Sequence, residues 1–291
     1  MANPWILAFR PKTLPAAIAP VAIGTAIAYG QGVHYFSMAL LVLFAALAIQ
    51  IGTNLANDYF DYVNGADTPE RVGPTRVTQA GLIAPKDVKA AMILMFALSA
   101  VACAVLVLRG GWPILMIGIL SILSGIFYTA GPRPLGYLGL GEIFAFIFFG
   151  PVAVGGTYYV QALDVTWPII LAGLAPGFFS VAILAVNNLR DIETDRKANK
   201  KTLAVRFGRS FALNEYLFAV IAAGLTPALV YALTQQHPWS LLSCSILFFA
   251  IPVIKTVLTK TDGPSLNAAL AATGKMLAIY SLLYTIGWIV R

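Results

Sequence analysis

The chain has 291 residues, of which 59% are hydrophobic and 11% are charged, and its mean hydropathy is +0.82. These values exclude an ordinary soluble globular domain and indicate an integral membrane protein. The apolar runs lack the period-two alternation that is typical of a transmembrane β-barrel. We therefore expect an all-α, polytopic membrane protein that forms a single domain over residues 1–291.

Membrane-spanning helices are predicted from long apolar runs, because a helix needs about 20 mostly apolar residues to cross a bilayer. About nine such runs fit the sequence. They cover approximately residues 14–30, 38–60, 87–108, 112–130, 142–160, 167–189, 211–233, 239–258 and 266–289.

The distribution of basic residues predicts the orientation of these spans. Lysines and arginines crowd alternate connections, above all residues 190–209, whereas the opposite face carries only Arg109 and Arg291. Because basic loops are retained on the cytoplasmic side, we expect a cytoplasmic N-terminus and an external C-terminus. The formal net charge of +7 then follows from topology, and we expect the lipid bilayer and no nucleic acid as a partner.

A first polar motif, NLANDYFDYVNGAD at residues 54–67, closes the second predicted span. At 100° per residue, Asn54, Asp58 and Asp61 fall within roughly 60° of arc on one helix face. Gly65 is a residue that commonly ends a helix, which places Asp67 in the following loop. The motif thus presents a narrow stripe of amide and carboxylate oxygens.

A second polar motif, NNLRDIETD at residues 187–195, closes the sixth predicted span. Asn187, Asp191 and Asp195 fall within roughly 80° of arc, and Asn188 lies beside them. The pairs Asn54–Asp58 and Asn187–Asp191 are related by the same offset of 133 residues. The offset suggests an internal repeat, and the even number of crossings between the motifs places both on one side of the membrane.

The carboxylates within each stripe repel one another, so bound protons or cations must offset this repulsion. Carboxylates one helical turn apart, about 6 Å, repel by roughly 3 kcal/mol at an effective dielectric constant of 20. The carboxylates therefore hold either protons or cations. Oxygen ligands without Cys or His select a hard ion such as Mg²⁺. Simple helix termination and an ion-coupled transporter remain as alternatives.

Basic loops follow both motifs and indicate the charge of the ligand. Arg71 and Arg76 follow the first motif, and a run that includes Lys200 and Lys201 follows the second. Aspartates that bind Mg²⁺ beside cations that contact oxyanions are typical of a diphosphate site. Arg76 and Lys201 are the basic residues that we favour most, because each follows a polar stripe directly.

Together, NDxxD, NNxxDxxxD and nine helices resemble the UbiA-type intramembrane prenyltransferases. Four blocks look most like the 1,4-dihydroxy-2-naphthoate polyprenyltransferases of menaquinone synthesis. They are RPKTLPAAIAPVAIGTA at 10–26, NLANDYFDYVNGAD at 54–67 followed by RVGPTR, YTAGPRPLGYLGLGE at 128–142, and NNLRDIETDRKANKKTLAVRFG at 187–208.

The resemblance implies a helical bundle around a central cavity, with two Mg²⁺ ions that bridge the diphosphate of a polyprenyl donor. The implied metal ligands are Asn54, Asp58, Asp61, Asn187 or Asn188, Asp191 and Asp195. The implied diphosphate-binding residues are Arg71, Arg76, Tyr128, Arg133, Lys200 and Lys201. Arg10 and Lys12 either bind the acceptor's carboxylate or anchor the first helix, and Asp67 serves the metal or the acceptor.

The implied reaction transfers a polyprenyl group from polyprenyl diphosphate to 1,4-dihydroxy-2-naphthoate. The ring loses CO2, and the product is demethylmenaquinol. The implied location is the bacterial inner membrane, with the active-site loops on the cytoplasmic side. Within the same superfamily a different aromatic acceptor is the alternative.

Overall fold

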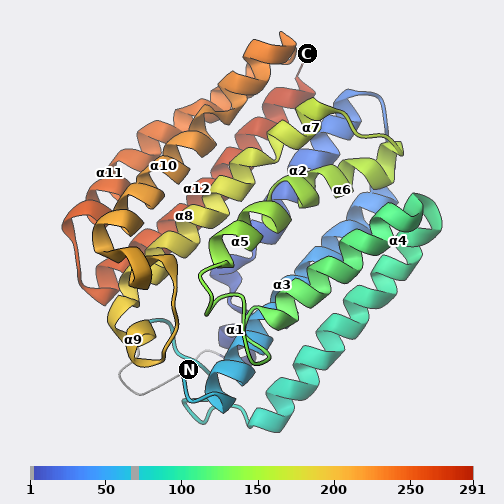
Figure 1. The fold of residues 1–291 in the computed structure, drawn as a ribbon. Helices are drawn as coiled ribbons and strands as arrows, with labels where there is room; N and C mark the ends of the chain where they lie inside the picture. The colour runs from blue at the N-terminus through green and yellow to red at the C-terminus, as the bar shows by residue number, and fades with distance from the viewer. Residues whose placement is uncertain (1–2, 67–71, 291) are drawn as a thin grey trace.

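The computed structural model describes residues 3–66 and 72–290, and their regular structure is entirely helical (Figure 1). The first half contains α1 (Pro4–Phe9), η1 (Pro11–Thr13), α2 (Pro15–Gly30), α3 (Phe36–Val63), α4 (Pro85–Phe127), α5 (Gly141–Phe149) and α6 (Pro151–Ala162). The second half contains α7 (Trp167–Ala172), α8 (Leu174–Arg190), α9 (Ile192–Lys197), α10 (Leu203–Thr234), η2 (Pro238–Ser245), α11 (Ile246–Thr259) and α12 (Gly263–Ile289).

The helices confirm the all-α membrane fold that the apolar runs predict. Seven segments of the described residues are long and apolar enough to cross a bilayer, and the bent pair Pro4–Thr13 and Pro15–Gly30 would make an eighth. Every predicted span falls on a helical segment, with two of them on α4. The number of nine crossings and the cytoplasmic N-terminus stay predictions.

The long helix α4 is folded back on itself at Gly111. Its 43 residues would reach about 65 Å as a straight helix, roughly twice the hydrocarbon thickness. Gly111 has φ 65° and ψ −154°, a conformation that glycine adopts without strain. A Cβ on Gly118 would lie 3.1 Å from the sulfur of Cys103, so the two halves pack antiparallel, as Figure 1 shows.

Two further spans are broken, and the breaks touch each other. The α5–α6 break lies at Gly150 and the α7–α8 break at Gly173. A Cβ on Gly173 would lie 2.7 Å from Cα of Pro151, and one on Gly150 would lie 2.7 Å from the carbonyl oxygen of Gly173. The absence of side chains at both glycines lets the two backbones meet directly.

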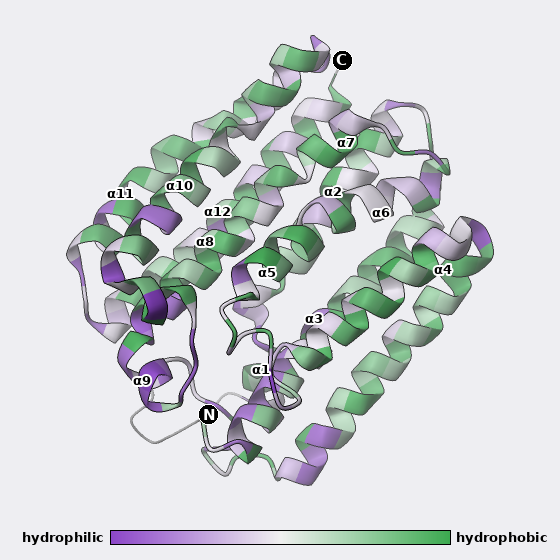
Figure 2. Ribbon diagram, viewed as in Figure 1, coloured by the Kyte–Doolittle hydropathy of each residue, from purple (hydrophilic) through white to green (hydrophobic). Residues whose placement is uncertain are grey.

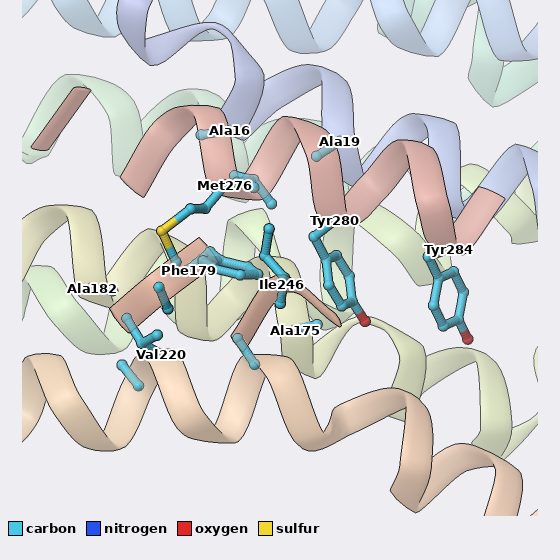
Figure 3. Packing of buried hydrophobic residues seen from close by; sticks show 14 of the residues in the cluster. Ala16, Ala19, Ala175, Phe179, Ala182, Val220, Ile246, Met276, Tyr280 and Tyr284 are labelled. Atoms are coloured by element: carbon cyan, nitrogen blue, oxygen red, sulfur yellow. The ribbon is translucent and has the colours of Figure 1, made fainter. Parts of the chain in front are cut away.

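The largest hydrophobic core of the described residues joins α2, α6, α7, α8, α10, α11 and α12 (Figure 3). Phe179 of α8 and Tyr280 of α12 are fully buried in it, with ring centroids 5.5 Å apart. The outer surfaces carry exposed apolar side chains such as Leu108, Trp112 and Phe248. An exterior of this kind is stable in lipid and not in water.

Polar residues concentrate at the end of the bundle that carries α1, α9 and the N-terminus (Figure 2). The described part of the loop after α3 and the loops after α4 and α9 also lie at this end. Both polar motifs therefore reach the same end of the molecule, as the sequence predicts.

The contact between the two broken spans can be tested with Gly173→Ala. The added methyl group would meet backbone atoms at 2.7–3.0 Å, so we expect a loss of about 1–3 kcal/mol in the free energy of unfolding. The measurement is thermal or denaturant unfolding of the purified protein in detergent.

Gly156→Ala is the matched control, because a Cβ on Gly156 would meet only side-chain atoms of Ile117, the nearest at 3.4 Å. Equal stability of the Gly173→Ala variant and the wild type would show that the backbones do not pack as described.

Candidate active site

A cavity of about 410 Å³ opens between the helices and joins both polar motifs. One stripe of α3 lines it from Val42 to Asp61 at helical spacing, and a stripe of the second half of α4 lines it from Ile114 to Gly125. Its deeper walls are apolar, including the stacked rings of Phe144 and Phe148, whose centroids lie 6.0 Å apart. Its other end is lined by carboxylates, amides and cations. One space thus combines a charged end with a long apolar channel.

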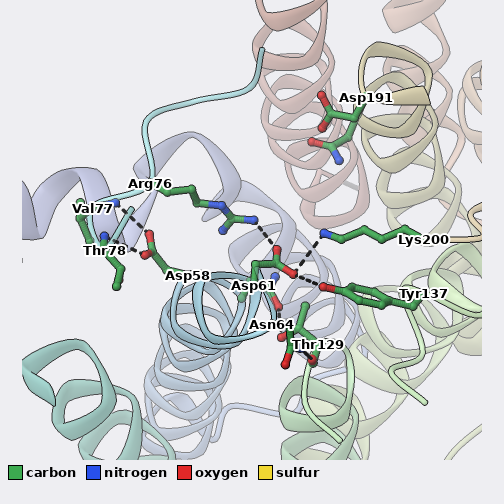
Figure 4. A network of polar contacts seen from close by, with 12 residues as sticks. Asp58, Asp61, Asn64, Arg76, Val77, Thr78, Thr129, Tyr137, Asp191 and Lys200 are labelled. Atoms are coloured by element: carbon green, nitrogen blue, oxygen red, sulfur yellow. Dashed lines mark hydrogen bonds and ion pairs between the residues drawn. The ribbon is translucent and has the colours of Figure 1, made fainter. Parts of the chain in front are cut away.

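Asp61 is at the centre of the polar end (Figure 4). Its side chain is 2% exposed and accepts from Nη2 of Arg76 at 2.9 Å, from the hydroxyl of Tyr137 at 2.7 Å and from Nζ of Lys200 at 3.1 Å. The three donors come from three loops that are far apart in the sequence. Such charge-assisted bonds offset the free-energy cost of burying the carboxylate.

Asp58 has a different role from its neighbour on the same helix. Its two carboxylate oxygens accept from the backbone N–H groups of Val77 and Thr78 at 3.1 and 3.0 Å. Asp61 is one of the described residues that line the cavity, whereas Asp58 is not. Asp58 therefore fixes the loop that carries Arg76, and reaches the cavity only through that loop.

Asn54 lies within the cavity wall, but its amide nitrogen is engaged. It donates to the carbonyl oxygen of Phe9 at 3.0 Å and to Oγ1 of Thr13 at 3.1 Å. Asn57, which also lines the cavity, accepts from Oγ1 of Thr129 at 3.0 Å. The packing of α3 thus turns Asn57 and Asp61 toward the cavity together.

The second motif presents Asp191 from the end of α8, and Asp191 and Asp195 line the same cavity as Asp61. Arg190 donates two hydrogen bonds to the carboxylate of Asp191, from Nε at 2.8 Å and from Nη2 at 2.5 Å. Nη2 of Arg190 also donates to Oδ1 of Asn187 at 2.9 Å. Asn188 donates from Nδ2 to Glu142 at 2.6 Å. Each half of the site therefore holds a carboxylate that a buried arginine neutralises.

Most of the residues predicted for the site do line the cavity. They are Arg10, Asn54, Asp61, Arg76, Tyr128, Asn187, Asn188, Asp191, Asp195 and Lys200. Burial raises the pKa of Tyr128, which lies just beyond the end of α4, so that its phenol stays protonated and available as a donor.

Other predicted residues lie elsewhere. Lys12 and Lys201 are exposed. Neither of them is among the described residues that line the cavity. Arg133 is exposed and borders a separate apolar groove beside Leu120 and Phe127. Asp67 and Arg71 fall outside the described residues. In the second basic loop the side chain of Lys200 reaches Asp61, and that of the favoured Lys201 does not. The backbone N–H of Lys201 donates to the carbonyl oxygen of Tyr137, which fixes the position of this loop.

The sequence interpretation missed four residues of the site: Asn57, Tyr137, Glu142 and Arg190. Tyr137 and Glu142 lie inside the quoted block 128–142, and Arg190 precedes Asp191. A basic residue directly before a motif aspartate was the available signal for Arg190. Tyr137 carried no such signal, because only the folded loop brings it to Asp61.

The oxygen donors around the cavity fit a hard divalent cation. Among the described residues no three His, Cys, Asp or Glu side chains come together as a ready-made cage. Mg²⁺ does not require one, since it commonly takes one or two carboxylates together with substrate phosphates and water. Asp61, Asp191 and Asp195, with the amide oxygens nearby, meet that description.

Comparison with known proteins places this geometry in a family. The sequence pattern of the UbiA prenyltransferase family matches residues 17–288. The chain is 39% identical to the 1,4-dihydroxy-2-naphthoate octaprenyltransferase of Mycobacterium tuberculosis over 278 residues, which cover 96% of this chain and 94% of the relative. It is 38% identical to the Escherichia coli protein of the same name, with 97% and 94% covered.

A solved structure shares the fold. It is that of a UbiA homologue from Archaeoglobus fulgidus bound to DMAPP and Mg²⁺, with a TM-score of 0.69, 19% identity and 98% of each chain covered. The match along nearly the whole sequence, with these relatives and this fold, shows that the chain belongs to the UbiA prenyltransferase family.

Proposed function

We propose that this protein transfers a polyprenyl group from polyprenyl diphosphate to 1,4-dihydroxy-2-naphthoate, with loss of CO2, in menaquinone synthesis. The observation that carries the proposal is the cavity, in which paired carboxylates and cations at one end adjoin a long apolar channel. Identities of 38–39% to two octaprenyltransferases of that substrate support the choice of acceptor.

The charged end suits the diphosphate. Asp61, Asp191 and Asp195, with amide oxygens of Asn57 and the other motif asparagines, would hold Mg²⁺ there. The bound metal would supply charge neutralisation for the diphosphate as a leaving group. The solved relative from Archaeoglobus fulgidus, bound to DMAPP and Mg²⁺, supports this use of the site.

The chain's own cations complete the stabilisation of the leaving group. Arg76 and Lys200 already lie against Asp61, at 2.9 and 3.1 Å, and both line the cavity. Guanidinium and ammonium groups at this end of the cavity are suited to bind phosphate oxygens. Donors that are fixed in advance where negative charge develops lower the barrier to cleavage of the carbon–oxygen bond.

The apolar channel protects the reaction from water. As the allylic carbon–oxygen bond breaks, the diphosphate takes the electron pair and the prenyl carbon becomes electrophilic. Phe144 and Phe148 face the cavity, and aromatic faces stabilise such a cation. The electron-rich naphthoate ring then forms the new carbon–carbon bond, and the carboxylate leaves as CO2. Arg10, which lines the cavity, is suited to hold that carboxylate.

The proposed reaction is tested with purified protein in nanodiscs. The assay mixture contains Mg²⁺, 1,4-dihydroxy-2-naphthoate and prenyl diphosphates of several chain lengths. We expect a prenylated, decarboxylated quinol, identified by its mass, that fails to form when EDTA replaces Mg²⁺. 4-Hydroxybenzoate is the control acceptor. Turnover of 4-hydroxybenzoate alone, or no product at any chain length, would refute the proposal.

The roles of the two motifs are tested with Asp61→Asn and Asp191→Asn. Each change removes a charge that the cations and the metal require, so kcat/KM should fall by at least about 100-fold. The measurement is the same quinol assay on protein that elutes as a single folded species. Asp164→Asn is the matched control, because Asp164 is exposed in the connection between α6 and α7 and is not among the described residues that line the cavity. Near-normal turnover of either motif variant would contradict the assignment.

A further inference from the structure

A buried guanidinium lies behind the second motif and neutralises Asp191. Arg190 has a side chain that is 1% exposed. Nε and Nη2 bind Asp191, and Nη2 also binds Asn187. Because a guanidinium only donates hydrogen bonds and costs much free energy when buried unpaired, its remaining nitrogen also needs an acceptor.

That acceptor comes from the last helix. Nη1 of Arg190 donates to Oδ1 of Asn267 at 2.6 Å. Asn267 lies on α12, 77 residues further along the chain. The helix α12 thus contributes a specific polar contact to the site.

The other end of the same amide reaches the loop of the first motif. Nδ2 of Asn267 donates to the carbonyl oxygen of Val72 at 3.2 Å. Val72 begins the described part of the loop that leads to Arg76 and to the amides that Asp58 binds. One asparagine therefore contacts both halves of the site.

The start of α12 is packed firmly against that loop. Asp262 caps the helix by accepting from the N–H of Ser265 at 2.9 Å. A Cβ on Gly263 would lie 1.9 Å from Cγ1 of Val72, so a larger residue at this position would displace the Val72 side chain. Asn267, one turn further on, is held by this packing at a fixed distance from both Val72 and Arg190.

We infer that Asn267 is a positioning residue, which orients Arg190 and through it the carboxylate of Asp191. The inference rests on the proposed function, since it assigns a task to the diphosphate-binding end of the cavity. Arg190 uses both carboxylate oxygens of Asp191, and each oxygen keeps a lone pair for the cavity side. The angle of the guanidinium therefore sets the angle at which Asp191 meets a cation.

The relay predicts a specific consequence of losing the acceptor. Without Oδ1 of residue 267, Nη1 of Arg190 would be buried without a partner, and the guanidinium would turn toward other acceptors. Asp191 would turn with it. The affinity for the metal and diphosphate would fall, whereas the apolar channel and its prenyl-binding surface would be unchanged.

The test compares Asn267→Leu with Asn267→Asp in the full-length protein. The readout is Mn²⁺-dependent binding of a non-reactive farnesyl thiolodiphosphate, measured by calorimetry without acceptor. Partners that orient metal ligands typically contribute 10- to 100-fold to affinity. We therefore expect Asn267→Leu to weaken binding by about tenfold. Asn267→Asp keeps an acceptor for Arg190 and should bind close to the wild-type affinity.

Asn214→Leu, an exposed asparagine on α10, is the matched control and should bind as the wild type does. Unchanged binding by Asn267→Leu would overturn the inference. Equal weakening in Asn267→Asp would also overturn it, by assigning the effect to the Val72 contact that both variants lose. If Asn267→Leu does not fold, Asn267→Ala removes the same acceptor with a smaller side chain, and its comparison with Asn267→Asp is read in the same way.

The two proposals fail in different ways. If the wild-type protein does not bind the analogue in the presence of Mn²⁺, the proposed function is wrong and the relay is wrong with it. If the wild type binds and the Asn267 variants do not differ from it, only the relay is wrong.

Discussion

The buried carboxylate of Asp61 imposes the main constraint on this structure. A charge that is 2% exposed at the edge of a membrane is tolerated only when donors surround it. Those donors arrive on the loop after α3, the loop after α4 and the loop after α9, through Arg76, Tyr137 and Lys200. The loops thus converge over the cavity because Asp61 requires them, and the cavity gains its cationic end from the same contacts.

The breaks in the helices shape the interior of the bundle more than the regular helical segments do. Gly111 turns α4 back, and Gly150 and Gly173 let two spans cross at backbone distance. The cavity borders the break at Gly150, because Phe149 and Val152 on either side of it both line the cavity. Where the chain bends therefore shapes part of the wall of the apolar channel.

Hydropathy predicted the helices well, because each span must satisfy its own backbone in lipid. The aspartate stripes were likewise visible, since spacing alone places Asn54, Asp58 and Asp61 on one helix face. The sequence did not show which part of that face meets the cavity, because packing against α4 fixes the rotation of α3. The rotation brings Asn57 and Asp61 inward and turns Asp58 toward the amides of Val77 and Thr78. Contacts such as Tyr137 to Asp61 join residues 76 positions apart, and no local pattern marks them.

The contact between Asn267 and Arg190 also bears on biogenesis. Helices enter the membrane in the order of synthesis, and Asn267 lies on α12, the last of the described helices. Until that helix is inserted, Arg190 and Asp191 are already in the membrane but lack the partner that orients them. A chain that stops before α12 would have the apolar channel without a finished anion site. Insertion of α12 and the start of the chemistry would then coincide, which limits ionisation of a reactive diphosphate in a half-built bundle.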